Sequence, residues 1–297
     1  MTHTNYPSIK SLEDLATTAR AEIHEETRFF NYVLRGELTR QAIEKLPLQD
    51  VTDKAYLWQQ KNVPPDLIIN HGSYIGDGVE GIASELQNKS TSNRALYSLI
   101  NTKDISQSGD MPIPSFMVFQ CGLEGGVLYC SAYFRALEVS NFLRINLEEM
   151  RLNLCTILKK IDATLVRITV FAFSAYNRPN QSTLDKPKLD QLKTVALLDL
   201  LDNDRGYVAT LLKEKAREAT FIEVEKLEII SEWASPSRKK RPELSNINSI
   251  SAAAESAIKV AQQLADLRIR HSVHAQVSDA AKQYTSAIDK LAEEFRK

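Results

Sequence analysis

The amino-acid sequence predicts a mixed α/β fold with helical segments at both ends. Three observations support this class. Both ends of the chain carry apolar residues at three- and four-residue spacing, as amphipathic helices do. The middle contains runs rich in β-branched and aromatic residues, separated by turn sequences such as GDMPIP and EGG. With 297 residues and 43% apolar content, the chain can bury a substantial core.

The first part of the chain predicts helices followed by a turn-rich segment. Residues 8–46 show the helical spacing of apolar side chains and indicate one or two amphipathic helices that end at Pro47. Between Asn62 and Gly81, two prolines and four glycines predict turns. A short helix is expected at 82–88.

The central part predicts strands with one helix among them. The apolar runs are bounded by turn residues, and EGG between two of them is a hairpin signal. The helix is expected where Leu147, Met150 and Leu154 recur at helical spacing. We expect strands at 95–101, 115–123, 126–137 and 164–176, and the helix at 146–161.

The last part predicts helices on either side of a basic linker. The linker contains RKKR without interleaved aromatic residues, which favours a solvated loop over a nucleic-acid-binding motif. Beyond it, Ser251 is a candidate N-cap, and apolar residues from Val277 to Phe295 repeat every three or four positions, as in a coiled coil or a helical hairpin. We interpret His271 and His274 as polar residues on this seam rather than as metal ligands, because no nearby carboxylate or thiol completes a ligand set.

Composition restricts the partners and the location of the protein. Lys and Arg total 37 against 38 Asp and Glu, so no overall field attracts nucleic acid or an acidic membrane. No run resembles a signal peptide or approaches the length of a membrane span, which predicts a cytoplasmic protein. Cys121, Cys130 and Cys155 lie in apolar surroundings and are expected to be reduced core thiols.

The block from Leu86 to Tyr176 contains two informative segments. In the first, Ser92, Asn93 and Arg94 are followed by an apolar run that ends in Ile100 and Asn101. The second runs from Ile113 to Asn146. Its fixed-spacing residues are Pro114, Gln120, Gly126, Leu128, Cys130, Tyr133, Arg135, Glu138 and Asn146.

These segments resemble the thymidylate synthase and dCMP hydroxymethylase family. The first is similar to a Ser-Arg-Arg triplet followed by a strand that ends in Trp-Asn. The second aligns without gaps on the stretch that begins Pro-Cys-His and ends Pro-Phe-Asn, and Glu138 replaces an aspartate there. The resemblance implies a twisted sheet in a back-to-back homodimer. We therefore expect four segments: helical 1–61, a thymidylate-synthase-like domain at 62–234, the linker 235–248, and a long helix or helical hairpin at 249–297.

The same resemblance implies that the catalytic side of the site is altered. Ser115 stands where the family has the cysteine that adds to the uracil ring. A thiol with a pKa near about 8.5 supplies some thiolate at neutral pH, whereas a serine needs an adjacent base. The neighbouring family histidine is Phe116 here. The family's N-terminal phosphate loop and C-terminal folate-closing segment are not found, so we expect no folate-dependent methyl transfer and no cofactor.

The resemblance implies that several nucleotide-binding residues of the family are retained. By resemblance, Arg135 clamps a nucleotide 5′-phosphate, and Arg94 adds a second charge from the other subunit. Asn146 reads the pyrimidine edge, and Tyr176 bonds the sugar 3′-hydroxyl. Gln120 is identical to the residue of the family. Two plainer interpretations remain open: Arg135 and Glu138 can form a surface ion pair, and Asn146 can cap the helix that follows it.

Three functions follow from these features. The first is a pseudoenzyme that binds a pyrimidine nucleotide as a binding or regulatory module. The second is an enzyme that acts on such a nucleotide without a cysteine adduct, with Glu138 as acid or base. The third is a dimerisation core whose terminal helices recruit a protein partner. Because the block lacks a nucleophile and a base, the first and third are favoured.

Overall fold

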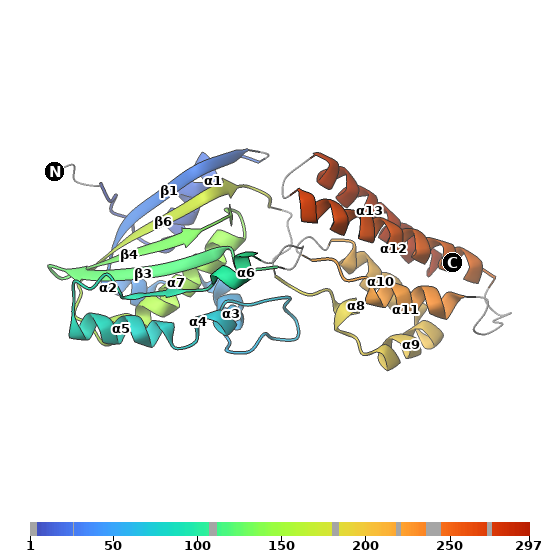
Figure 1. The fold of residues 1–297 in the computed structure, drawn as a ribbon, viewed down its shortest axis with the longest axis horizontal. Coiled ribbons are helices and arrows are strands. Elements are labelled where there is room, and N and C mark those ends of the chain that lie inside the picture. The colour runs from blue at the N-terminus through green and yellow to red at the C-terminus, as the bar shows by residue number, and fades with distance from the viewer. Residues whose placement is uncertain are drawn as a thin grey trace. The chain divides into compact units, whose positions relative to one another are not determined.

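The computed structural model describes residues 5–25, 27–106, 112–179, 184–217, 221–235, 245–271 and 275–297. It confirms the mixed α/β class, with a six-stranded mixed sheet and long helices near the C-terminus (Figure 1). The chain forms two compact units. The sheet unit comprises Met1–Pro64, Ile69–Ser106 and Ile113–Gln181, and the helical unit comprises Pro65–Ile68, Gln107–Pro112 and Ser182–Lys297.

The sheet contains both parallel and antiparallel pairs. Its order is β1-β6-β4-β3-β2, and β5 pairs with the end of β6. The pairs β4–β6 and β5–β6 are parallel, and the other pairs are antiparallel. The strands are β1 (Arg28–Thr39), β2 (Leu96–Ser98), β3 (Phe116–Glu124), β4 (Val127–Phe134), β5 (Leu137–Glu138) and β6 (Leu165–Tyr176).

Strand β1 corrects the helices predicted for residues 8–46. Only α1 (Leu12–Glu22) and α2 (Arg40–Lys45) are helical there. Tyr32, Leu34 and Leu38 are buried while alternate residues are not, which is the period of a strand with one covered face. Because β1 pairs with β6, the N-terminal segment belongs to the sheet unit.

Helix α7 (Phe142–Leu158) forms the centre of the sheet unit. Most of its residues are buried, and it packs against α1, α2, α3 (Gln49–Trp58) and α5 (Gly78–Asn88). The predicted helix at 82–88 lies within α5. Short helices α4 (Gly72–Ile75) and α6 (Thr102–Ser106) complete the unit.

The β3–β4 hairpin confirms the turn predicted from EGG. Gly125 and Gly126 have positive φ values of 58° and 75°, a conformation that glycine adopts without strain. Cys121 and Cys130 face each other across this hairpin, with their sulfur atoms 3.7 Å apart, and both are buried free thiols as predicted.

The helical unit has a hydrophobic core of its own. Helices α12 and α13 pack side by side as a hairpin, with Tyr284, Ile288 and Leu291 buried on the predicted seam (Figure 1). Ser251 lies inside α12, whose N-cap is Asn246. The helices are α8 (Lys188–Gln191), α9 (Thr194–Asn203), α10 (Arg205–Lys215), α11 (Glu225–Ala234), α12 (Ile247–Arg270) and α13 (Ala275–Glu294).

Two features predicted from the sequence fall outside the described residues: the basic RKKR patch and His274. Among the described helices, none is long and apolar enough to cross a membrane.

Candidate functional site

Four of the predicted site residues converge at one edge of the sheet. Ser115 precedes β3 and Arg135 follows β4, and the backbone N–H of Arg135 donates to the carbonyl oxygen of Ser115 at 3.0 Å. Glu138 pairs with Tyr176, the last residue of β6. Strands β4 and β6 are parallel, so this edge holds their carboxyl ends. In α/β sheets, ligands bind preferentially outside the carboxyl ends of parallel strands.

Arg135 is held by the segment before β3. Its Nε donates to the carbonyl oxygen of Pro114 at 3.2 Å and its Nη2 to that of Ile113 at 2.9 Å. These bonds use two of the five N–H groups of a guanidinium. The side chain is exposed, so its other donors can meet an anion from solvent.

Glu138 caps helix α7. Its carboxylate is 2% exposed and accepts hydrogen bonds from the backbone N–H groups of Ser140, Asn141, Phe142 and Arg178, at 2.7–3.2 Å. Three of these groups lie at the helix N-terminus, where N–H groups lack intrahelical acceptors. The carboxylate is therefore not the surface ion pair with Arg135 that the sequence left open, and it stabilises the start of α7.

Asn146 lies in the second turn of α7 and is 4% exposed. Because the helix begins at Phe142, Asn146 is not its N-cap, and that interpretation is wrong. Its amide donates to Oε2 of Glu149 at 3.0 Å, and the same carboxylate meets Nδ1 of His71 at 2.9 Å. The amide is thus committed to a buried partner.

The His71–Glu149 pair is the centre of a buried polar network that sequence reasoning missed. The ring of His71 packs edge-on against those of Trp58 and Phe116. The sequence signal is a pair of glutamates within an otherwise apolar helix, NLEEMRLNL.

The network continues along α7. Asn153 accepts from Nε2 of Gln59 at 2.8 Å and donates to the hydroxyl of Tyr97 at 2.8 Å. Burial raises the pKa of Tyr97 well above its usual value, and the negative charge of Glu149 raises it further. The phenol therefore stays neutral, and the network braces α7 against α3.

Arg94 and Gln120 lie away from this edge. Arg94 is exposed on the loop before β2, and Gln120 lies in the middle of β3, with its amide donating to the carbonyl oxygen of Asn93 at 3.0 Å. Within one chain the structure does not bring Arg94 to Arg135. The role implied by the resemblance, in which Arg94 serves the neighbouring subunit, is compatible with this position.

Two further arginines meet at the same edge as Arg135. Arg28 begins β1, opposite Tyr176, and its Nε donates to the buried hydroxyl of Ser174 at 2.6 Å. The guanidinium carbon of Arg178 lies 5.5 Å from the ring centroid of Tyr176. Arg178 was visible in the FSAYNR text, but Arg28 becomes a candidate only once β1 is known to pair with β6.

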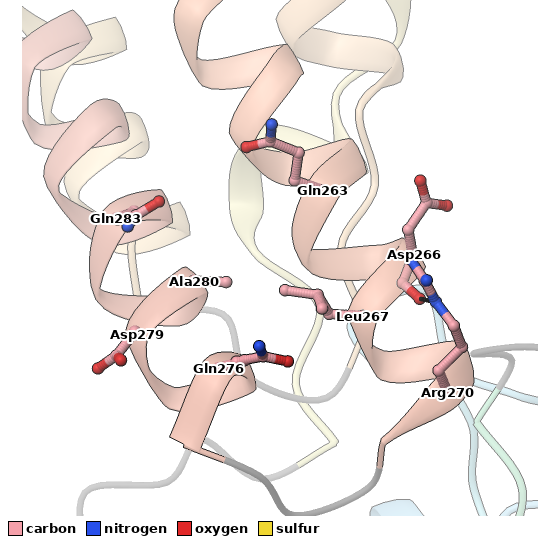
Figure 2. A pocket seen from close by; sticks show the side chains of 8 residues that line it. All are labelled: Gln263, Asp266, Leu267, Arg270, Gln276, Asp279, Ala280 and Gln283. Carbon is pink, nitrogen blue, oxygen red and sulfur yellow. Dashed lines mark hydrogen bonds between the residues drawn. The ribbon is translucent and has the colours of Figure 1, made fainter.

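Two cavities among the described residues lie elsewhere. A groove of about 420 Å³ runs between α12 and α13, with Leu267 and Ala280 facing each other between polar residues such as Asp266 and Asp279 (Figure 2). A second, of about 270 Å³, is bordered by Gln59, Gly72 to Glu80, and Asn153. Groups of three or more His, Cys, Asp or Glu side chains that could hold a metal ion are also absent from the described part of the chain.

Comparison with known proteins finds no matching family model and no matching curated protein. The resemblance to the thymidylate synthase family therefore rests on the residues quoted from the sequence.

Proposed function

We propose that the sheet unit is a divergent thymidylate-synthase-like domain that binds a pyrimidine nucleoside monophosphate and does not carry out folate-dependent methyl transfer. The observation that carries the proposal is the convergence of Ser115, Arg135 and Tyr176 at the carboxyl ends of β4 and β6. The resemblance assigns these residues to one site. Each reaches this edge from a different segment of the chain.

The proposed roles follow from the chemistry of the side chains. The planar guanidinium of Arg135 binds the 5′-phosphate, for which its fork of donors is suited. The hydroxyl of Tyr176 bonds the sugar. The residue after Ser115 is Phe116, whose ring stacks on Phe134 inside the core. The ring of His71 packs against Phe116, and its Nδ1 is engaged by the carboxylate of Glu149, so in this proposal His71 does not act as the base that a serine nucleophile needs.

The pyrimidine preference rests on the resemblance alone. The amide of Asn146 donates to Glu149 and is shielded from solvent, so it reads no base edge in this arrangement. The phosphate and sugar contacts are the parts of the proposal that the geometry supports.

A homodimer belongs to the same proposal. Strands β1, β4 and β6 expose large apolar side chains, which are of the kind that mediates association. Phe30 and Phe173 contact each other there, with ring centroids 5.5 Å apart. The exposed residues are Phe29, Phe30, Val33, Tyr133 and Phe173.

The two alternatives fare differently. An enzyme that uses Glu138 as acid or base is disfavoured, since four backbone N–H groups occupy its carboxylate. A role in recruiting a partner protein is favoured by the groove between α12 and α13, whose apolar centre and polar rim suit a peptide segment (Figure 2).

A thermal-shift titration tests the proposal. We expect dUMP to raise the melting temperature and Arg135→Ala to weaken binding by about 10- to 100-fold, the loss expected for charged hydrogen bonds. Arg20→Ala, which removes an exposed arginine paired with Glu13, is the matched control. If a panel of pyrimidine monophosphates leaves the melting curve unchanged, the proposal fails and the dimerisation core with a protein partner remains.

A further inference from the structure

Three arginines lie at the carboxyl edge of the sheet, around the ends of β4 and β6. Arg28 lies directly opposite Tyr176 in the β1–β6 ladder, and Arg178 follows Tyr176 by two residues with its guanidinium near the ring. Arg135 follows β4, which runs parallel to β6. The three guanidiniums therefore come from different segments at one edge of the sheet.

The two added arginines are positioned by the fold. The Nε of Arg28 donates to the hydroxyl of Ser174, which is 2% exposed, and its guanidinium carbon lies 4.6 Å from the centroid of the Phe30 ring. The backbone N–H of Arg178 donates to the buried carboxylate of Glu138 at 3.0 Å. Binding an anion at such side chains costs less ordering entropy than binding at freely moving ones.

None of these three guanidiniums is paired with a carboxylate among the described residues. Five other arginines of the sheet unit, Arg20, Arg40, Arg144, Arg151 and Arg167, each have an acidic partner within 4.0 Å, whereas Arg35 and Arg94 have none among the described residues. Two carboxylates lie near these arginines: that of Glu138 accepts from backbone N–H groups, and Glu25, whose backbone bridges to Asn177, is exposed and forms no ion pair with them among the described residues. In a chain with a net charge of −1, three unneutralised cations at one edge form a local positive field.

We propose that Arg28 and Arg178 bind a second phosphoryl group beside the one held by Arg135, so that the ligand is a pyrimidine nucleoside diphosphate or triphosphate. This inference rests on the proposed nucleotide site. A monophosphate carries about two negative charges at neutral pH, fewer than the three guanidiniums present, whereas a longer phosphate chain balances them. Each additional phosphoryl group also offers oxygens for further charge-assisted hydrogen bonds.

Calorimetric titration with dUMP, dUDP and dUTP tests the inference. The wild-type protein should bind dUDP or dUTP at least about tenfold more tightly than dUMP, as expected for one added set of charged hydrogen bonds. Arg28→Ala and Arg178→Ala should each remove most of this preference and leave the affinity for dUMP within about twofold. Arg28→Lys and Arg178→Lys, which keep the charge without the fork, should keep part of it.

The outcomes separate the two proposals. If dUMP binds and longer phosphate chains bind no more tightly, the inference is overturned and the monophosphate site stands. If no nucleotide binds, both are overturned. Inorganic tripolyphosphate that binds the wild type and the Arg135→Ala, Arg28→Ala and Arg178→Ala variants equally would show non-specific attraction and overturn the inference. Equal melting temperatures of the unliganded variants exclude misfolding.

Discussion

The backbone N–H of Arg135 and the carbonyl oxygen of Ser115 are joined by a hydrogen bond of 3.0 Å. This bond joins Ser115 to Arg135, the proposed phosphate ligand. Because it uses main-chain atoms only, it does not depend on the side chain at either position. The adjoining ladder, in which Phe116 is paired with Phe134, fixes the register of both residues.

Ser115→Cys should leave the fold and nucleotide binding unchanged without creating methyl transfer. The thiol would replace a hydroxyl of similar size, but the next residue is Phe116 rather than a histidine, and its ring is buried. The melting temperature tests whether the fold is unchanged. A product assay with dUMP and methylene-tetrahydrofolate tests whether methyl transfer occurs. Formation of thymidylate by the variant would show that the cysteine alone was missing.

Glu138→Gln should destabilise the sheet unit by about 1–2 kcal/mol, and Glu138→Ala by about 2–4 kcal/mol, because charged hydrogen bonds to the N-terminus of α7 are weakened or lost. Urea denaturation gives the free energy of unfolding. Glu124→Gln, an exposed glutamate at the end of β3, is the control. The enzymatic alternative would be supported instead if the wild type converts a nucleotide and the Glu138→Gln variant is equally stable but inactive.

Asn146→Ala should lower the free energy of unfolding by about 1–3 kcal/mol, since the buried carboxylate of Glu149 loses one donor. It should not alter the ratio of the affinities for dUMP and dCMP. Titration of both nucleotides against the variant and the wild type measures that ratio. A collapse of discrimination in the variant would restore the base-reading role that the resemblance implies.

Stability should fall at alkaline pH because of Cys130. Burial raises the pKa of this thiol well above its usual value, and the neighbouring Cys121 raises it further. The native state therefore keeps the proton while the unfolded chain releases it near about pH 8.5, so the free energy of unfolding decreases as pH rises beyond that value. Denaturation at several pH values should show a shallower decline for Cys130→Ala; equal slopes would contradict this.

The local parts of the fold could be predicted from the sequence. EGG identified the β3–β4 hairpin, alternation identified β6, and the repeat from Val277 to Phe295 identified the helical hairpin. Strand β1 was taken for helix because its apolar residues also fit a three- and four-residue spacing. Its pairing with β6, far away in the sequence, is what selects the strand, and no local pattern contains that information.

The candidate site, too, could be predicted from the sequence only in part. Ser115 and Arg135 were predicted from a fixed spacing along residues 113–146, and Tyr176 from a resemblance further along the same block. Arg28 was missed because only the β1–β6 ladder brings it to Tyr176. The burial of Asn146 and Glu149 was missed because it depends on His71, which arrives from a turn-rich segment before α5.

The helical unit takes up a short piece of chain from within the sequence of the sheet unit. The backbone N–H of Ile68 donates to the carbonyl oxygen of Leu184 at 2.9 Å, and that of Lys186 to the carbonyl oxygen of Asp66 at 2.7 Å. During synthesis, residues 65–68 leave the ribosome well before their partners exist. The helical unit can thus be completed only after translation has passed Lys186, although four of its residues are synthesised before most of the sheet unit.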